Sequence, residues 1–171
     1  MLHHKLQRLS YGCLYHALFA ITGDEAWLEH VDDVSQPRWH ARLHAAGLMV
    51  MTYWSSELIE QPCPAEFWTV LRERFAALPG VPTHISLLVT VKGLNVGHHI
   101  VAVALPVSED HPAIISDSAK NSLWEMPLAD FLLSPWAEAY AVESIAPAEV
   151  DAYPEDPGHL YFTEPAGDYA M

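Results

Sequence analysis

The chain has 171 residues, 51% of them hydrophobic, and a formal net charge of −14. The length predicts one domain over residues 1–171, and the apolar content is enough for a packed core, which argues against a disordered protein. The negative charge argues against a nucleic-acid partner, whose phosphates need Lys and Arg, but it permits a basic peptide partner or an acidic surface.

Helices dominate the first half of the predicted structure. An apolar helix is predicted from Ser10 or Gly12 to Thr22, and because apolar side chains cover almost every side of it, we expect it at the centre of the domain. Gly23 would end this helix, and Asp24 would cap a short second helix over residues 25–30. The other elements expected in this half are a helix that follows Ser35-Gln36-Pro37 and ends at Gly47, a strand over 48–54, a rigid extended segment at Pro62-Cys63-Pro64, and a helix over 66–78.

Strands dominate the second half. The expected strands cover residues 83–91, 98–105, 113–116, 123–126 and 139–145, with a short helix over 127–133. Helices followed by strands are typical of an α+β fold. Residues 146–171 are rich in Pro, Gly, Asp and Glu, which predicts a surface wrap or a loose acidic tail outside a core of about residues 6–145.

Cys13 stands at the predicted start of the buried helix. A helix start carries free backbone N–H groups and the positive end of the macrodipole, and both favour a thiolate, the nucleophilic form of cysteine. Gly12 permits a tight turn and the close approach of a substrate backbone. Gln7 lies six residues before Cys13, and its amide could donate to an oxyanion beside the sulfur. The alternative is that Cys13 is a small core residue, because free cysteine is often buried.

A histidine opens the buried strand over 98–105, and Asp117 ends the strand after it. A cysteine nucleophile needs a base, and the base needs a third group that fixes its tautomer. Cys13, a histidine and Asp117 therefore form a candidate triad. Strand alternation puts His98 and His99 on opposite faces, and either one can be the base on this evidence. The alternative for Asp117 is a plain turn residue, because Asp favours turns.

These residues resemble the papain-like cysteine peptidases. The Gln-x5-Cys spacing of Gln7 and Cys13 is typical of that family. A histidine before an apolar strand, with Asp about 18 residues later, is similar to the bacteriocin-processing branch, the double-glycine leader peptidase domains. The resemblance extends over about residues 6–131. In that branch the histidine directly precedes the apolar run, which favours His99. Ser118 departs from the family, which usually has Pro there.

The resemblance implies a papain-like fold, with an N-terminal helical half that carries the nucleophile helix and a C-terminal antiparallel sheet half. It also implies a thiol-dependent hydrolase that attacks a peptide or amide bond. Cys13 would attack, His99 would carry the proton, Asp117 would orient the imidazole, and Gln7 would bind the oxyanion together with the N–H of Cys13. The same acyl-enzyme can pass to an amine or release ammonia. A deamidase, transglutaminase or acyltransferase effector is therefore the alternative enzyme, and an inactive papain-like binding domain is the alternative without catalysis.

The predicted substrate-binding residues are Gly12, Gly97 and Trp54, with Trp54 as a wall of the cleft. We expect a peptide or protein substrate. His40 and His44 lie four residues apart, as zinc ligands on a helix can. Neither a zincin motif nor CxxC accompanies them, so we expect no metal and no cofactor.

Cys13 and Cys63 are the two cysteines of the chain, too few for a disulfide scaffold. No apolar run is long enough to span a bilayer, and the N-terminus lacks the apolar segment of a secretory signal. We therefore expect a cytoplasmic protein, and an effector delivered into a host cell would fit the same features. The sequence does not indicate the oligomeric state.

Overall fold

The computed structural model describes residues 1–8, 12–30, 39–56, 61–93 and 97–148. Within these ranges the chain forms helices and one six-stranded sheet. The α-helices are α1 (Cys13–Thr22), α2 (Trp39–Ala45), α3 (Ala65–Ala76) and α4 (Leu128–Leu132), and the 3-10 helices are η1 (Glu25–His30) and η2 (Pro135–Ala137). The strands are β1 (Leu48–Ser55), β2 (His84–Lys92), β3 (His98–Pro106), β4 (Ala113–Ser116), β5 (Trp124–Met126) and β6 (Ala141–Pro147).

The strands lie in the order β1-β6-β2-β3-β4-β5, and all neighbours are antiparallel. The last strand in the sequence, β6, lies between β1 and β2, so it joins the strand of the helical half to the strands of the second half. The predicted α+β class is therefore confirmed.

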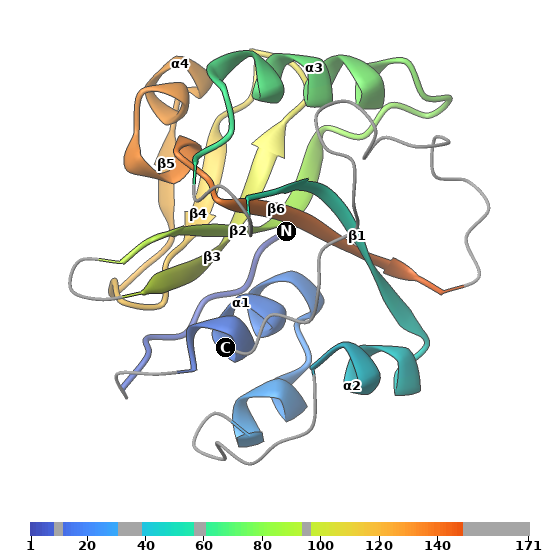
Figure 1. Ribbon diagram of the computed structural model, residues 1–171, viewed down its shortest axis with the longest axis vertical. Coiled ribbons are helices and arrows are strands. Elements are labelled where there is room, and N and C mark those ends of the chain that lie inside the picture. The colour runs from blue at the N-terminus through green and yellow to red at the C-terminus, as the bar shows by residue number, and fades with distance from the viewer. Residues whose placement is uncertain (9–11, 31–38, 57–60, 94–96, 149–171) are drawn as a thin grey trace.

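Helices cover both faces of the sheet (Figure 1), with α1, η1 and α2 on one face and α3 and α4 on the other. Successive side chains of a strand alternate between faces, so each strand serves two cores. On β3, Ile100 and Ala102 pack in the core with α1, while Val101 and Val103 pack in the core with α3 and α4. This alternation agrees with the predicted pattern of residues 98–105.

The central helix α1 matches its prediction. Residues Leu14 to Ala20 are all buried, because the helix has too little polar surface to face water. Gly12 at its start has φ 97° and Gly23 at its end has φ 72°, a left-handed conformation that glycine adopts without a steric cost. The N–H of Gly23 donates to the carbonyl of Phe19 at 2.7 Å. Gly12 therefore makes Cys13 the first residue of the helix, and Gly23 ends the helix after Thr22.

The differences from the predicted elements concern short helices. Residues 25–30 form a 3-10 helix, and Asp24 does cap it, because its Oδ1 accepts the N–H of Ala26 at 2.9 Å. The predicted helix over 127–133 is shorter, and η2 was not expected; Pro135 opens η2 because its fixed φ suits a helical first turn. The Ser35-Gln36-Pro37 cap lies outside the described residues, as does most of the predicted tail over 146–171. The prediction was wrong at the start of this tail, where Ala146 and Pro147 belong to β6.

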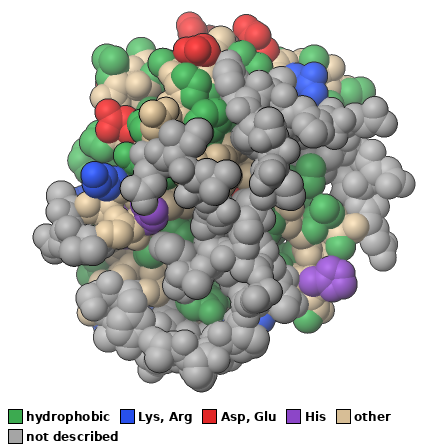
Figure 2. Space-filling model, in the orientation of Figure 1, with side chains coloured by type: hydrophobic (Ala, Val, Ile, Leu, Met, Phe, Trp, Pro, Cys, Tyr) green, Lys and Arg blue, Asp and Glu red, His purple; other side chains and the backbone are tan. Residues whose placement is uncertain are grey.

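Carboxylates lie over the layer of α3 and α4 on the face drawn in Figure 2. This agrees with the net charge of −14, and such a surface repels phosphates. Within the described ranges, no helix combines the length and the hydropathy needed to cross a membrane.

Gly23→Ala should destabilise the fold more than Gly80→Ala. Both glycines have a left-handed backbone, at φ +72° and +66°, but a Cβ at Gly23 would lie 2.7 Å from Nε2 of His3, and one at Gly80 would meet nothing within 4 Å. We expect the free energy of unfolding to fall by about 2 kcal/mol for Gly23→Ala and by about 1 kcal/mol for Gly80→Ala, measured by urea denaturation. Equal losses would mean that His3 moves aside at no cost.

Candidate active site

His99 and Asp117 are joined by a short hydrogen bond, in which Nε2 of His99 donates to Oδ1 of Asp117 at 2.7 Å. His99 is the second residue of β3, and Asp117 directly follows β4, its antiparallel neighbour. The N–H of Ala119 donates to the same carboxylate oxygen at 3.0 Å. Only 8% of Asp117 is exposed, so water competes little for this carboxylate. These two hydrogen bonds hold the Asp117 carboxylate in place, and the carboxylate in turn fixes the orientation of the His99 ring.

The same contacts set the charges of the pair. The hydrogen bond from His99 to Asp117, followed by its hydrogen bond with Cys13, raises the pKa of His99 to about 9, although burial acts in the opposite direction. Burial acts to raise the pKa of Asp117, but the bonds from His99 and Ala119 and the nearby positive charges outweigh it and hold that pKa below the ordinary value. At neutral pH the pair is therefore an imidazolium and a carboxylate.

The sulfur of Cys13 is the third group of the candidate site, after His99 and Asp117. We refer to these three residues as the Cys13–His99–Asp117 series. Cys13 is half-buried, and the helix α1 that it begins packs against β3. The N–H of Ile100 donates to Sγ of Cys13 at 3.5 Å. The last pair between β3 and β4 joins Ala102 to Ser116. Ile100 lies two residues beyond this pair, so its N–H is not used in the β3–β4 ladder and can donate to the sulfur. Nε2 of His99 is engaged by Asp117, which leaves Nδ1 as the ring nitrogen for the sulfur.

Gln7 lies next to the carboxylate through Ser118. The N–H of Gln7 donates to the carbonyl of Ser118 at 2.6 Å, and the hydroxyl of Ser118 donates to Oε1 of Gln7 at 2.7 Å. Earlier in the same segment, Nδ1 of His4 lies 2.8 Å from the hydroxyl of Ser116. His4 and Gln7 are therefore hydrogen-bonded to the residues on either side of Asp117.

The structure separates the two candidate bases. His99 reaches Asp117, whereas His98 is exposed and its ring lies 5.6 Å, between centroids, from the ring of Tyr140. Extending the β3–β4 register by one pair puts Asp117 opposite Val101, so that Asp117 and His99 are diagonal neighbours on one face. His98 belongs to the other face, which explains why His99 rather than His98 forms the bond.

The predicted substrate-binding residues lie in different surroundings. Gly12 adjoins Cys13, and its carbonyl accepts Nδ1 of His16 at 3.0 Å. Gly97 precedes β3 with φ 83°, and its carbonyl accepts the N–H of Gly93 at 2.9 Å.

Trp54 has a packing role that the sequence did not predict. Its ring meets Phe67 of α3 edge-on, with 5.8 Å between centroids, and it packs against the core on the α3 side of the sheet. Cys13 packs against the core on the other side. The predicted role of Trp54 as a wall of the cleft stays a prediction.

Other titratable groups do not extend the site. Cys63 is buried, and this burial raises the pKa of its thiol to about 12, which makes it a poor nucleophile. Within the described part of the chain, no three His, Cys, Asp or Glu side chains come together as metal ligands. The side chain of His40, part of the discounted zinc pair with His44, lies outside the described residues.

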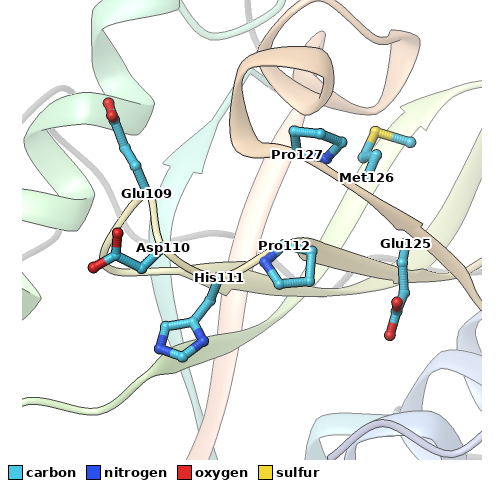
Figure 3. A pocket seen from close by; sticks show the side chains of 7 residues that line it. All are labelled: Glu109, Asp110, His111, Pro112, Glu125, Met126 and Pro127. Carbon is cyan, nitrogen blue, oxygen red and sulfur yellow. The ribbon is translucent and has the colours of Figure 1, made fainter.

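A cavity of about 400 Å³ lies at the opposite end of β3 from Cys13. It is lined by Glu109, Asp110, His111, Pro112, Glu125, Met126 and Pro127. The carboxylates of Glu109, Asp110 and Glu125 point in different directions (Figure 3), so they do not converge on one ligand. This cavity is separate from the Cys13–His99–Asp117 series.

Sequence reasoning missed two groups of the site, the hydroxyl of Ser118 and the N–H of Ile100. The departure of Ser118 from the Pro of the similar family is a signal that could have indicated the first. In comparisons with known proteins, no family model matches this chain, and no curated protein sequence matches it. The function is therefore proposed from the site itself, in which a thiol lies at the strand of an imidazole that is hydrogen-bonded to a carboxylate.

Proposed function

We propose that the protein is a papain-like cysteine peptidase or a related amidase, which attacks a peptide or amide bond through Cys13. The observation that carries this proposal is the hydrogen bond between His99 and Asp117, with the Cys13 sulfur at the same strand, where it accepts the N–H of Ile100. A nucleophile, a base and a group that orients the base are the arrangement that covalent acyl transfer requires. The chain order Gln7, Cys13, His99, Asp117, and a buried helix packed on an antiparallel sheet, support the papain-like assignment.

The reaction follows from the charges of the site. The sulfur of Cys13, as a thiolate beside the imidazolium of His99, forms a bond to the substrate carbonyl carbon, and the carbonyl electron pair moves to oxygen. The amide of Gln7 and the N–H of Cys13 stabilise this oxyanion. His99 gives its proton to the leaving amine as the carbon–nitrogen bond breaks. His99 then takes a proton from water, and the hydroxide attacks the thioester and releases the acid and Cys13.

The substrate is proposed to be a peptide or protein. The net charge of −14 and the carboxylates visible in Figure 2 favour a substrate with basic residues, because opposite charges accelerate association.

Labelling with iodoacetamide at about pH 6 tests the proposal, because an ordinary thiol with a pKa of about 8.5 is almost entirely protonated there. We expect Cys13 to be alkylated faster than free cysteine, and a peptidyl electrophile to label the same residue, as mapped by mass spectrometry. Cys63 is the internal control, since its burial and raised pKa should leave it unmodified. A Cys13 that reacts no faster than free cysteine, and that the peptidyl probe does not label, would favour the inactive binding domain.

A further inference from the structure

We propose that Ser118 is a positioning residue that sets the orientation of the Gln7 amide, so that its NH₂ group faces the oxyanion formed at Cys13. This inference rests on the proposed function, because it assigns a role within that acyl transfer. It concerns the position at which the chain departs from the similar peptidases.

Two contacts join Ser118 to Gln7, one through the main chain and one through the side chains. The backbone bond of 2.6 Å fixes the main chain of Gln7 against Ser118, and the side-chain bond of 2.7 Å holds its amide oxygen. Only 3% of Ser118 is exposed, so water does not replace its hydroxyl as a donor. The two bonds therefore hold the amide beside Ser118, with its oxygen toward the hydroxyl.

The orientation matters because the two ends of an amide are opposite in character. The oxygen accepts hydrogen bonds and the NH₂ group donates them, and rotation about the last side-chain bond exchanges the two. A hydroxyl that donates to Oε1 directs the NH₂ group away from Ser118 and polarises the amide, which strengthens its N–H donors. With the oxygen turned toward Cys13 instead, the amide would repel a developing oxyanion.

Ser116 provides a matched control two residues away. Its hydroxyl is also buried, at 4% exposed, and it also contacts the segment before α1, but its partner is His4 rather than Gln7. A general loosening of that segment should therefore follow from Ser116→Ala as well as from Ser118→Ala. A loss that depends on the amide should follow from Ser118→Ala alone.

Two probes of the full chain separate the oxyanion from the thiol. Acylation of Cys13 by p-nitrophenyl acetate, followed as the burst of p-nitrophenolate, passes through an oxyanion; alkylation by iodoacetamide does not. We expect Ser118→Ala to slow acylation about 10-fold while alkylation stays within about 2-fold, because one neutral hydrogen bond is lost. Ser118→Thr should restore acylation, and Ser116→Ala should leave both rates within about 2-fold. Gln7→Ala should slow acylation by about 10- to 100-fold, and adding Ser118→Ala should slow it no further.

Three results would overturn the inference. Acylation at the wild-type rate in Ser118→Ala, with a clear loss in Gln7→Ala, would mean that Ser118 does not act through the amide. A parallel loss of acylation and alkylation would mean a structural role. A wild-type Cys13 that reacts with neither probe would refute the proposed function as well, which keeps the two failures distinct. Should Ser118→Ala not fold, Ser118→Cys, which keeps the size but donates weakly, is compared in the same way.

Discussion

His99→Ala should lower the rate at which p-nitrophenyl acetate acylates Cys13 by about 10² to 10⁴, the range that a positioned base contributes. In the proposed mechanism the imidazole of His99 holds the negative charge of the sulfur and moves the proton, and Cys13 is among the groups that raise its pKa. The measurement is the burst rate of the folded variant near neutral pH, with circular dichroism as the check on folding.

His98→Ala is the matched control for this prediction. His98 is the adjacent histidine of the same strand, but it is exposed and faces Tyr140 instead of Asp117. We expect it to retain acylation within about 3-fold, as exposed positions outside a site usually do. If His98→Ala were the more damaging substitution, the base would be assigned to the wrong histidine.

Asp117→Asn should slow acylation by about 10- to 10³-fold with the fold intact. The hydrogen bond to Asp117 is the largest cause of the raised pKa of His99, so the neutral amide should return that pKa from about 9 toward its ordinary value of 6.5. His99 in the variant would then lose its proton at a lower pH than in the wild type. At neutral pH its ring would no longer be a cation that pairs with the sulfur. The loss should be smaller than the factor of about 10⁴ that the same change costs a serine triad, because a thiolate is charged before it attacks.

Two measurements check this prediction, the acylation rate and an NMR titration of the His99 ring. Asp110→Asn is the control, since Asp110 is an exposed carboxylate in the turn between β3 and β4, and it should alter neither. Asp117→Ala should lose at least as much activity as Asp117→Asn. Wild-type rates in both Asp117 variants would reduce the site to a Cys13–His99 dyad and leave Asp117 as a turn residue.

The sequence by itself determined most of the local structure. The start and end of α1 were predictable because glycines flank a continuous apolar segment, and the alternation of β3 was predictable because its residues serve two cores. The α+β class followed from the order of these elements. Cys13, at the first residue of α1, and Asp117, directly after β4, could be located in the same way, since each lies at the boundary of a well-marked element.

Only the tertiary structure decided which side chains meet. Strand alternation alone leaves the two adjacent histidines equivalent, and only the family resemblance favoured His99. The β3–β4 register puts His99 and not His98 against Asp117, because a shift of one residue would exchange the faces. The contact between Gln7 and Ser118 joins residues 111 positions apart in the sequence. The ring of Trp54 packs against Phe67 of α3, which is also a contact between separate elements of the chain. Local patterns carry no information on such pairings, since strand register and helix packing are set by burial over the whole chain.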